Sequence, residues 1–141
     1  MTGDILPKKL VFAIGSYACR RETLQWDGEK LIYQASEHGD SSEQKIIVPG
    51  GSEWQNFWIA VRNIGVWHWR GKYDEIYVCD GVEWEIELAV GDEKIKSEGC
   101  GSYPPNGADV ASEAFKQLLR ALGELMNDQV FIKGWYYEAW D

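Results

Sequence analysis

The stretch that most constrains the fold is residues 82–90, VEWEIELAV, in which large apolar residues alternate with glutamates. The glutamates are Glu83, Glu85 and Glu87. Successive side chains of a β-strand point to opposite faces of a sheet, so this alternation predicts a strand with one buried face and one solvated face. A sheet of this kind needs a second layer to cover its apolar face.

A turn signal follows this strand. Gly91-Asp92 separates it from residues 93–99, EKIKSEG, and predicts a hairpin. Centred on that turn, the hairpin places Glu87 opposite Lys96 and Ala89 opposite Lys94. The lysines would partly neutralise the glutamates, which is also what a plain solvated sheet face with weak ion pairs would show.

The first third of the chain is predicted to be mostly sheet. Asp27-Gly28 lies between the β-rich runs 9–26 and 29–35 and predicts another hairpin. Residues 45–48 are predicted to form a short strand that stops at Pro49. The polar stretch between them, residues 36–44, is predicted to be a loop.

Two later segments have the periodicity of amphipathic helices. The first is predicted to begin with a capping box formed by Ser52 and Gln55 and to end at Gly65. Its apolar stripe consists of Trp54, Phe57, Trp58 and Val61. The second covers about residues 108 to 126, with Asn106 or Asp109 as its cap. Its apolar stripe consists of Ala111, Phe115, Leu118, Leu119, Leu122 and Met126.

Together these elements predict one α+β domain over residues 1–141, with an antiparallel β-sheet and two α-helices packed on one face. Asp-Gly, Lys-Ile and a proline turn before a helix occur in both halves, so a βββα-βββα-β pseudo-duplication is a further hypothesis. Its halves would be residues 9–65 and 66–126, followed by a final strand at 129–140. Two similar units without duplication remain the alternative.

The net charge of −9 is unevenly distributed along the chain. Residues 1–70 contain 8 basic and 8 acidic residues, whereas residues 71–141 contain 6 and 15. An acidic excess repels phosphate backbones and attracts basic proteins or cations, so nucleic acid is not expected as a partner. The alternative is that the acidity serves only solubility.

The cysteine pattern and the lengths of the apolar runs indicate in which cellular compartment the protein is expected. Cys19, Cys79 and Cys100 are an odd number without a C-x-x-C pair, which favours reduced thiols over a disulfide framework or a zinc site. No run approaches the roughly 20 apolar residues that cross a bilayer. We therefore expect a cytoplasmic protein that binds neither a membrane nor a cofactor.

Residues 66–70, VWHWR, are the first candidate site. If they form a strand, Trp67 and Trp69 share one face and pack under the first helix, while His68 and Arg70 lie on the open face. His68 and Arg70 would then join Glu83 and Glu85 in a shallow polar groove. Carboxylates beside a histidine perform acid–base chemistry only where burial shifts their pKa values, so we predict no catalytic residues.

Two further segments are candidates for binding. The turn at residues 99–107, GCGSYPPNG, offers Tyr103 and free backbone groups as ligand contacts, although it could equally be a connector. The tail at residues 134–140, GWYYEAW, would expose Tyr136 and Trp140 on an edge strand. Such an edge is a natural surface for a homodimer or a protein partner.

The tryptophan pattern also carries a family likeness. Trp67-x-Trp69, Asp80-Gly-x-x-Trp84 and Tyr103-Pro104 ahead of a helix resemble a set of small uncharacterised bacterial proteins over roughly residues 52–120. Members tend to have Gly-Ser-Asn before the Tyr-Pro region, where this chain has Gly99-Cys100-Gly101. A compact tryptophan-rich chain is also similar to products of mobile bacterial gene cassettes. The resemblance implies no activity.

Two functional hypotheses follow. The first is a non-catalytic binding module that uses the acidic sheet face and the aromatic-rich edge, with an unknown protein as its partner. The alternative is a small-molecule-binding protein, or a hydrolase-like enzyme, with its site near Trp67-His68-Trp69 and the 99–107 loop.

Overall fold

The computed structural model describes residues 5–16, 20–37, 40–74, 82–104, 107 and 112–127. Within these ranges the strands are β1 (Lys9–Ser16), β2 (Arg20–Trp26), β3 (Leu31–Glu37), β4 (Asp40–Ile47), β5 (Lys72–Asp74), β6 (Val82–Val90) and β7 (Glu93–Cys100). The helices are α1 (Gly51–Ile64), the short 3-10 turn η2 (Val66–His68) and α2 (Glu113–Leu125).

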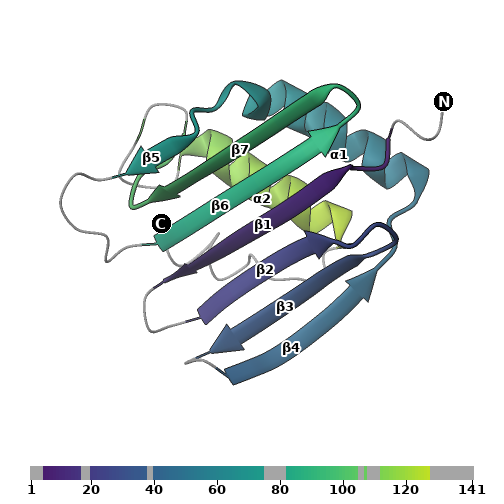
Figure 1. Cartoon of the computed structure of the whole chain (residues 1–141), viewed down its shortest axis with the longest axis horizontal. Helices are drawn as coiled ribbons and strands as arrows, with labels where there is room; N and C mark the ends of the chain where they lie inside the picture. Colours follow the sequence, from purple (N-terminus) through teal and green to yellow (C-terminus); the bar gives the residue numbers. More distant parts are fainter. Residues whose placement is uncertain are drawn as a thin grey trace.

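All seven strands belong to one sheet in the order β4-β3-β2-β1-β6-β7-β5. Neighbouring strands are antiparallel except β5, which runs parallel to β7. Both α-helices lie behind the same face of this sheet (Figure 1). The predicted α+β architecture, an antiparallel-rich sheet with helices on one face, is confirmed.

The hydrophobic core lies between the sheet and the helices. Central strands β1 and β6 pair so that Phe12 lies opposite Ile86 and Ile14 lies opposite Trp84, and all four side chains are buried. The stripe of α2 packs onto them, with Phe115 5.1 Å from Trp84 between ring centroids. The described members of both predicted helix stripes are buried, except Trp58, which is partly exposed.

The β6–β7 hairpin has the predicted register. Glu87 lies opposite Lys96 and Ala89 lies opposite Lys94. Alternation fixed which residues point inward, and the Gly91-Asp92 turn fixed the pairing.

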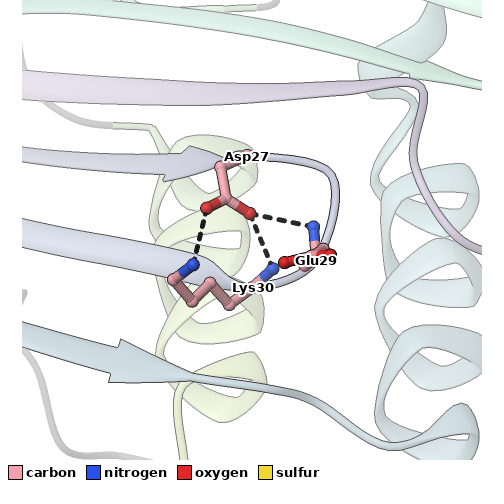
Figure 2. A network of polar contacts seen from close by, with 3 residues as sticks. All are labelled: Asp27, Glu29 and Lys30. Atoms are coloured by element: carbon pink, nitrogen blue, oxygen red, sulfur yellow. Dashed lines mark hydrogen bonds and ion pairs between the residues drawn. The ribbon is translucent and has the colours of Figure 1, made fainter.

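The Asp27 turn joins β2 and β3 as predicted, but with a loop of residues 27–30 between the paired Trp26 and Leu31. One carboxylate oxygen of Asp27 accepts the backbone N–H groups of Glu29 and Lys30, at 2.8 and 2.9 Å. The other oxygen lies 2.9 Å from the Lys30 ammonium (Figure 2). Lys30, followed by the two backbone donors, lowers the pKa of Asp27 to about 2.

The helix ends differ in part from the predicted caps. Helix α1 begins at Gly51 with Gly50 as its cap, so the Ser52–Gln55 capping box is wrong. Gly65 ends α1 as expected, in the left-handed conformation at φ 90°. Helix α2 begins at Glu113, where the Ser112 hydroxyl accepts the N–H of Phe115 at 3.1 Å. Asn106, Asp109 and Ala111 lie outside the described residues.

The predicted loop at residues 36–44 is also wrong. Strand β3 continues to Glu37, and β4 runs from Asp40 to Ile47 along one margin of the sheet. Charged side chains are common on edge strands, where they discourage pairing with other chains. Among the described residues, four strands precede α1 and three lie between α1 and α2. The strand expected at 129–140 lies outside the described residues.

Candidate functional site

The sheet face opposite the helices carries the charged residues of the central strands. On β6, Trp84, Ile86 and Leu88 are buried against the helices, so the alternate side chains of Glu83, Glu85 and Glu87 point to this opposite face, which we call the open face. The strand pairing places Val11 of β1 and Lys96 of β7 on either side of Glu87. Ion pairs and exposed side chains, rather than apolar packing, therefore dominate this face.

A small depression lies on the open face between β1, β6 and β7. Its lining consists of Val11, Glu85, Ile86, Glu87, Lys96, Ser97 and Glu98. Its volume is about 120 Å³, whereas pockets for small organic ligands usually measure about 300–1,000 Å³. Because one water molecule occupies about 30 Å³ of liquid, the depression suits a few waters or one side-chain head group.

Two carboxylates in this depression oppose each other directly. Glu85 of β6 pairs with Glu98 of β7 in the strand register. Like charges at directly opposite positions of an antiparallel pair are destabilising. The sequence already contained this pair, since the register that sets Glu87 against Lys96 also sets Glu85 against Glu98, but our prediction did not include Glu98.

Basic residues flank the glutamates at longer range. The Lys9 ammonium lies 3.8 Å from a carboxylate oxygen of Glu87, and the Arg21 guanidinium lies 4.0 Å from one of Glu85. All four side chains are solvent-accessible, and such pairs contribute little to stability. Lys72 of β5 lies opposite Glu98 in the strand register, so each carboxylate of the Glu85–Glu98 pair has one basic neighbour. Glu85 is exposed and Glu98 is half-buried, so both can be approached from solvent.

Much of the acidic excess of the chain belongs to residues that the structure does not describe. Residues outside the described ranges include seven acidic residues and one lysine, which accounts for six of the nine net negative charges. Among the described residues the open face carries both signs of charge, as the predicted pairing of Glu87 with Lys96 implied.

The VWHWR segment is not a strand, and this prediction is wrong. After Gly65 the chain makes a 3-10 turn, in which the N–H groups of His68 and Trp69 donate to the carbonyls of Gly65 and Val66. As a result, the indole rings of Trp67 and Trp69 pack against different elements. Trp67 stacks on Trp58 of α1 at 6.1 Å, whereas Trp69 packs edge-on against Trp84 of β6.

His68 and Arg70 are both exposed, but they do not belong to the open face. His68 ends η2, outside the sheet. The Arg70 guanidinium covers the Tyr73 ring at 4.4 Å, and the Arg70 N–H donates to the Tyr73 hydroxyl at 2.8 Å. A Cβ placed on Gly107 would lie 3.2 Å from Nη2 of Arg70, so this side chain reaches the 99–107 loop.

Tyr103 belongs to the hydrophobic core and not to a ligand site. It is 3% exposed, and its ring centroid lies 5.0 Å from that of Phe115. The loop beside it is tied to the core, because the Trp84 indole N–H donates to the Ser102 carbonyl at 3.0 Å. The structure thus brings Arg70 to this loop, but it separates Tyr103 and His68 from Glu83 and Glu85.

The expectation of reduced thiols is contradicted at Cys100, which is disulfide-bonded. This cysteine is 8% exposed at the end of β7, opposite Glu83 of β6. Cys19 and Cys79, the other two cysteines of the chain, lie outside the described residues. An odd number of cysteines therefore did not exclude a disulfide.

Within the described ranges, no three histidine, cysteine or acidic side chains are grouped closely enough to hold a metal ion. No helix in the part of the chain that the structure describes is long and apolar enough to cross a membrane. Tyr136 and Trp140, the predicted interface residues, lie outside that part.

No protein-family model matches the chain, and no curated protein matches it either. Its function has to be argued from the open face itself.

Proposed function

We propose that this protein is a non-catalytic binding module that holds a basic side chain of a polypeptide partner in the depression on the open face. The observation that carries the proposal is the directly opposed pair Glu85 and Glu98. A lysine or arginine head group between them would convert an unfavourable like-charge pair into two favourable ones.

The shape of the depression supports a side chain as the occupant rather than a free metabolite. Its volume of about 120 Å³ is below the usual range for small-molecule pockets. Val11 at its wall offers an apolar surface for the methylene stem of a basic side chain. Exposed carboxylates repel phosphates, which disfavours nucleic acid on this face.

The small-molecule alternative lacks the aromatic side chains that were expected to line its pocket. Tyr103 and Trp69 are buried in the core, and Trp67 is stacked on Trp58. A cytoplasmic location stays a prediction. The disulfide at Cys100 argues against that location, because disulfides form and persist mainly in oxidising compartments.

A peptide titration followed by NMR tests the proposal. The probes are an arginine peptide, a lysine peptide and a matched peptide with glutamine in place of the basic residue, each added at low ionic strength. We expect amide shifts concentrated in β1, β6 and β7 with the basic peptides only. The double variant Glu85→Gln/Glu98→Gln should weaken binding about tenfold, which corresponds to about 1.4 kcal/mol.

The matched control is Glu113→Gln/Glu124→Gln, which removes two exposed carboxylates from α2 behind the other face of the sheet. This variant has the same net charge as the test variant, and its peptide affinity should stay within twofold of the unmodified protein. Equal weakening in both variants, or shifts spread over the whole surface, would show only non-specific charge attraction and refute the proposal.

A further inference from the structure

Strand β4 ends the sheet and has β3 as its neighbour (Figure 1). Its outer edge therefore has no strand beside it among the described residues. The N–H and C=O groups along such an edge are a template for another strand. Natural edges are commonly protected by shortness, proline, bulges or charged side chains. Strand β4 is long and has no proline, and its pairing with β3 is irregular only near Ser36, so its charges are the main protection along residues 43–47.

Apolar side chains are exposed at this edge. Ile46 is 52% exposed, and Val48, just after the strand, is 70% exposed. Ile46 lies beside Ile32 of β3 on the open face. Singly exposed apolar residues are ordinary, so the case for a contact here rests on the open edge and on its charges.

Charge on β4 selects both the partner and its alignment. Glu43 and Lys45 occupy alternate positions, and their side chains lie 3.6 Å apart within the strand. If a second copy of β4 pairs antiparallel about a two-fold axis through Gln44, Glu43 of each copy lies opposite Lys45 of the other. Opposite charges at directly opposed positions stabilise an antiparallel pair.

The neighbouring alignments are disfavoured by the same charges. Moving the axis by one residue to Lys45 would set that lysine against its own copy, and moving it to Glu43 would set two glutamates against each other. Each of these residue-centred alignments keeps side chains on their proper faces, so charge is what distinguishes them.

We infer that the protein forms a homodimer by antiparallel pairing of β4 with β4 of a second copy, about an axis through Gln44. The two sheets then join into one, with the helices of both copies on one side and both open faces on the other. A contact along one strand is smaller than the roughly 1,200–2,000 Å² of standard interfaces, so the dimer should be weak and concentration-dependent. This inference does not depend on the proposed peptide site, which lies on β1, β6 and β7.

Sedimentation velocity on the complete chain over a range of concentrations tests this dimer. The unmodified protein should shift from monomer to dimer as its concentration rises. In the Lys45→Glu variant, Glu43 of each copy would face a glutamate at position 45 of the other copy. In the Glu43→Lys variant, Lys45 of each copy would face a lysine at position 43 of the other. Each single variant should raise the dimer dissociation constant about tenfold or more. Their monomers should keep the circular dichroism spectrum of the unmodified protein.

Two combinations make the test specific. The double variant Glu43→Lys/Lys45→Glu should recover the dimer, because it restores opposite charges at both positions. Mixing Lys45→Glu protein with Glu43→Lys protein should give a heterodimer that neither forms alone. A chain that stays monomeric at every concentration would overturn the inference. So would a dimer that ignores these charges but is lost on deletion of residues 135–141.

Discussion

On β6, Trp84, Ile86 and Leu88 turn toward the helices and are buried, whereas Glu83 and Glu85 turn to the open face and are exposed. The same strand therefore takes part in two different kinds of contact. Aromatic rings packed at about 5–6 Å fill the covered face. The ion pairs on the open face are 3.8–4.0 Å long and solvent-accessible. The difference indicates that the covered face supplies the stability, and that the open face can change its charges at little cost to the fold.

Trp84 tests the covered face most directly. Its ring packs against Trp69, Tyr73 and Phe115, and its indole N–H donates to the Ser102 carbonyl. Trp84→Ala should lower the free energy of unfolding by about 3–5 kcal/mol, because it removes a buried ring and leaves a cavity. Chemical denaturation followed by far-ultraviolet circular dichroism measures the loss.

Trp84→Phe separates packing from hydrogen bonding. It keeps an aromatic ring but leaves the buried Ser102 carbonyl without the indole donor, so it should cost less than Trp84→Ala. If Trp84→Ala destabilised the protein by less than about 1 kcal/mol, the aromatic cluster would not be the main source of stability.

The disulfide at Cys100 provides the next largest expected effect. Reduction should lower the free energy of unfolding by about 2–4 kcal/mol, because the bond restricts the unfolded chain. Thermal unfolding with and without a thiol reductant measures this difference, and Cys100→Ser should abolish it. If the unmodified protein melted at the same temperature in both conditions, the disulfide would add no stability to the fold.

The parts of the fold that the sequence predicted are those in which one local pattern decides the outcome. In β6, alternation gave the buried residues, and Gly91-Asp92 gave the register with β7. The stripe of α2 was predictable because its apolar residues recur at helical spacing. These local signals agree with the tertiary contacts that finally hold them.

The errors lie where tertiary contacts decide the outcome. W-x-W has the spacing of a strand, but the left-handed turn at Gly65 and the separate partners Trp58 and Trp84 favour a 3-10 turn. The start of β4 was predicted to be a loop because its residues are polar, but polar and charged side chains are common on edge strands. At the candidate site, Glu85 was predictable from alternation, and Glu98 becomes visible only when the register is carried across the hairpin.

On the open face, two single substitutions are expected to change the free energy of unfolding in opposite directions. Glu98→Gln removes the repulsion by Glu85, which lies directly opposite it, and also the attraction to Lys72 of the three-residue strand β5. We expect the relief of repulsion to be the larger effect and to raise the free energy of unfolding by about 0.2–0.5 kcal/mol. Glu87→Gln removes attraction to Lys9 and Lys96, so this variant should lower the free energy of unfolding by about the same amount. Urea denaturation of both variants at low ionic strength measures the difference, and high salt should reduce it.

A gain in stability at Glu98 combined with weaker peptide binding would show that the like-charge pair serves recognition and not folding. If Glu98→Gln instead lowered the stability by more than about 1 kcal/mol, Glu98 would be a structural residue, and the contrast between the two faces would fail there.

The Asp27 turn should give the smallest effect, because it lies at the end of β2 and β3 and its residues are exposed. Folding lowers the pKa of Asp27 from 3.8 to about 2, chiefly through Lys30. The carboxylate therefore stabilises the folded state fully only above pH 3.8, and this contribution is lost as the pH falls through about 2. Asp27→Asn should lower the free energy of unfolding at neutral pH, and the deficit should shrink on acidification.

Folding also raises the pKa of Lys30, mainly through its hydrogen bond to Asp27. The contribution of the lysine is therefore complete below its ordinary pKa of 10.5 and is lost as the pH rises through the higher folded value. Urea denaturation of Asp27→Asn and the unmodified protein from pH 2 to 11 should show a difference that is widest at intermediate pH. Glu29→Gln, in the same turn, is the control and should show a much smaller profile. The backbone N–H of Glu29 contacts Asp27 (Figure 2), and its carboxylate is only the smallest cause of the raised pKa of Lys30. A difference that stayed constant across this range would mean that the turn is held by its backbone hydrogen bonds alone, which asparagine preserves, and that the charge on Asp27 adds nothing.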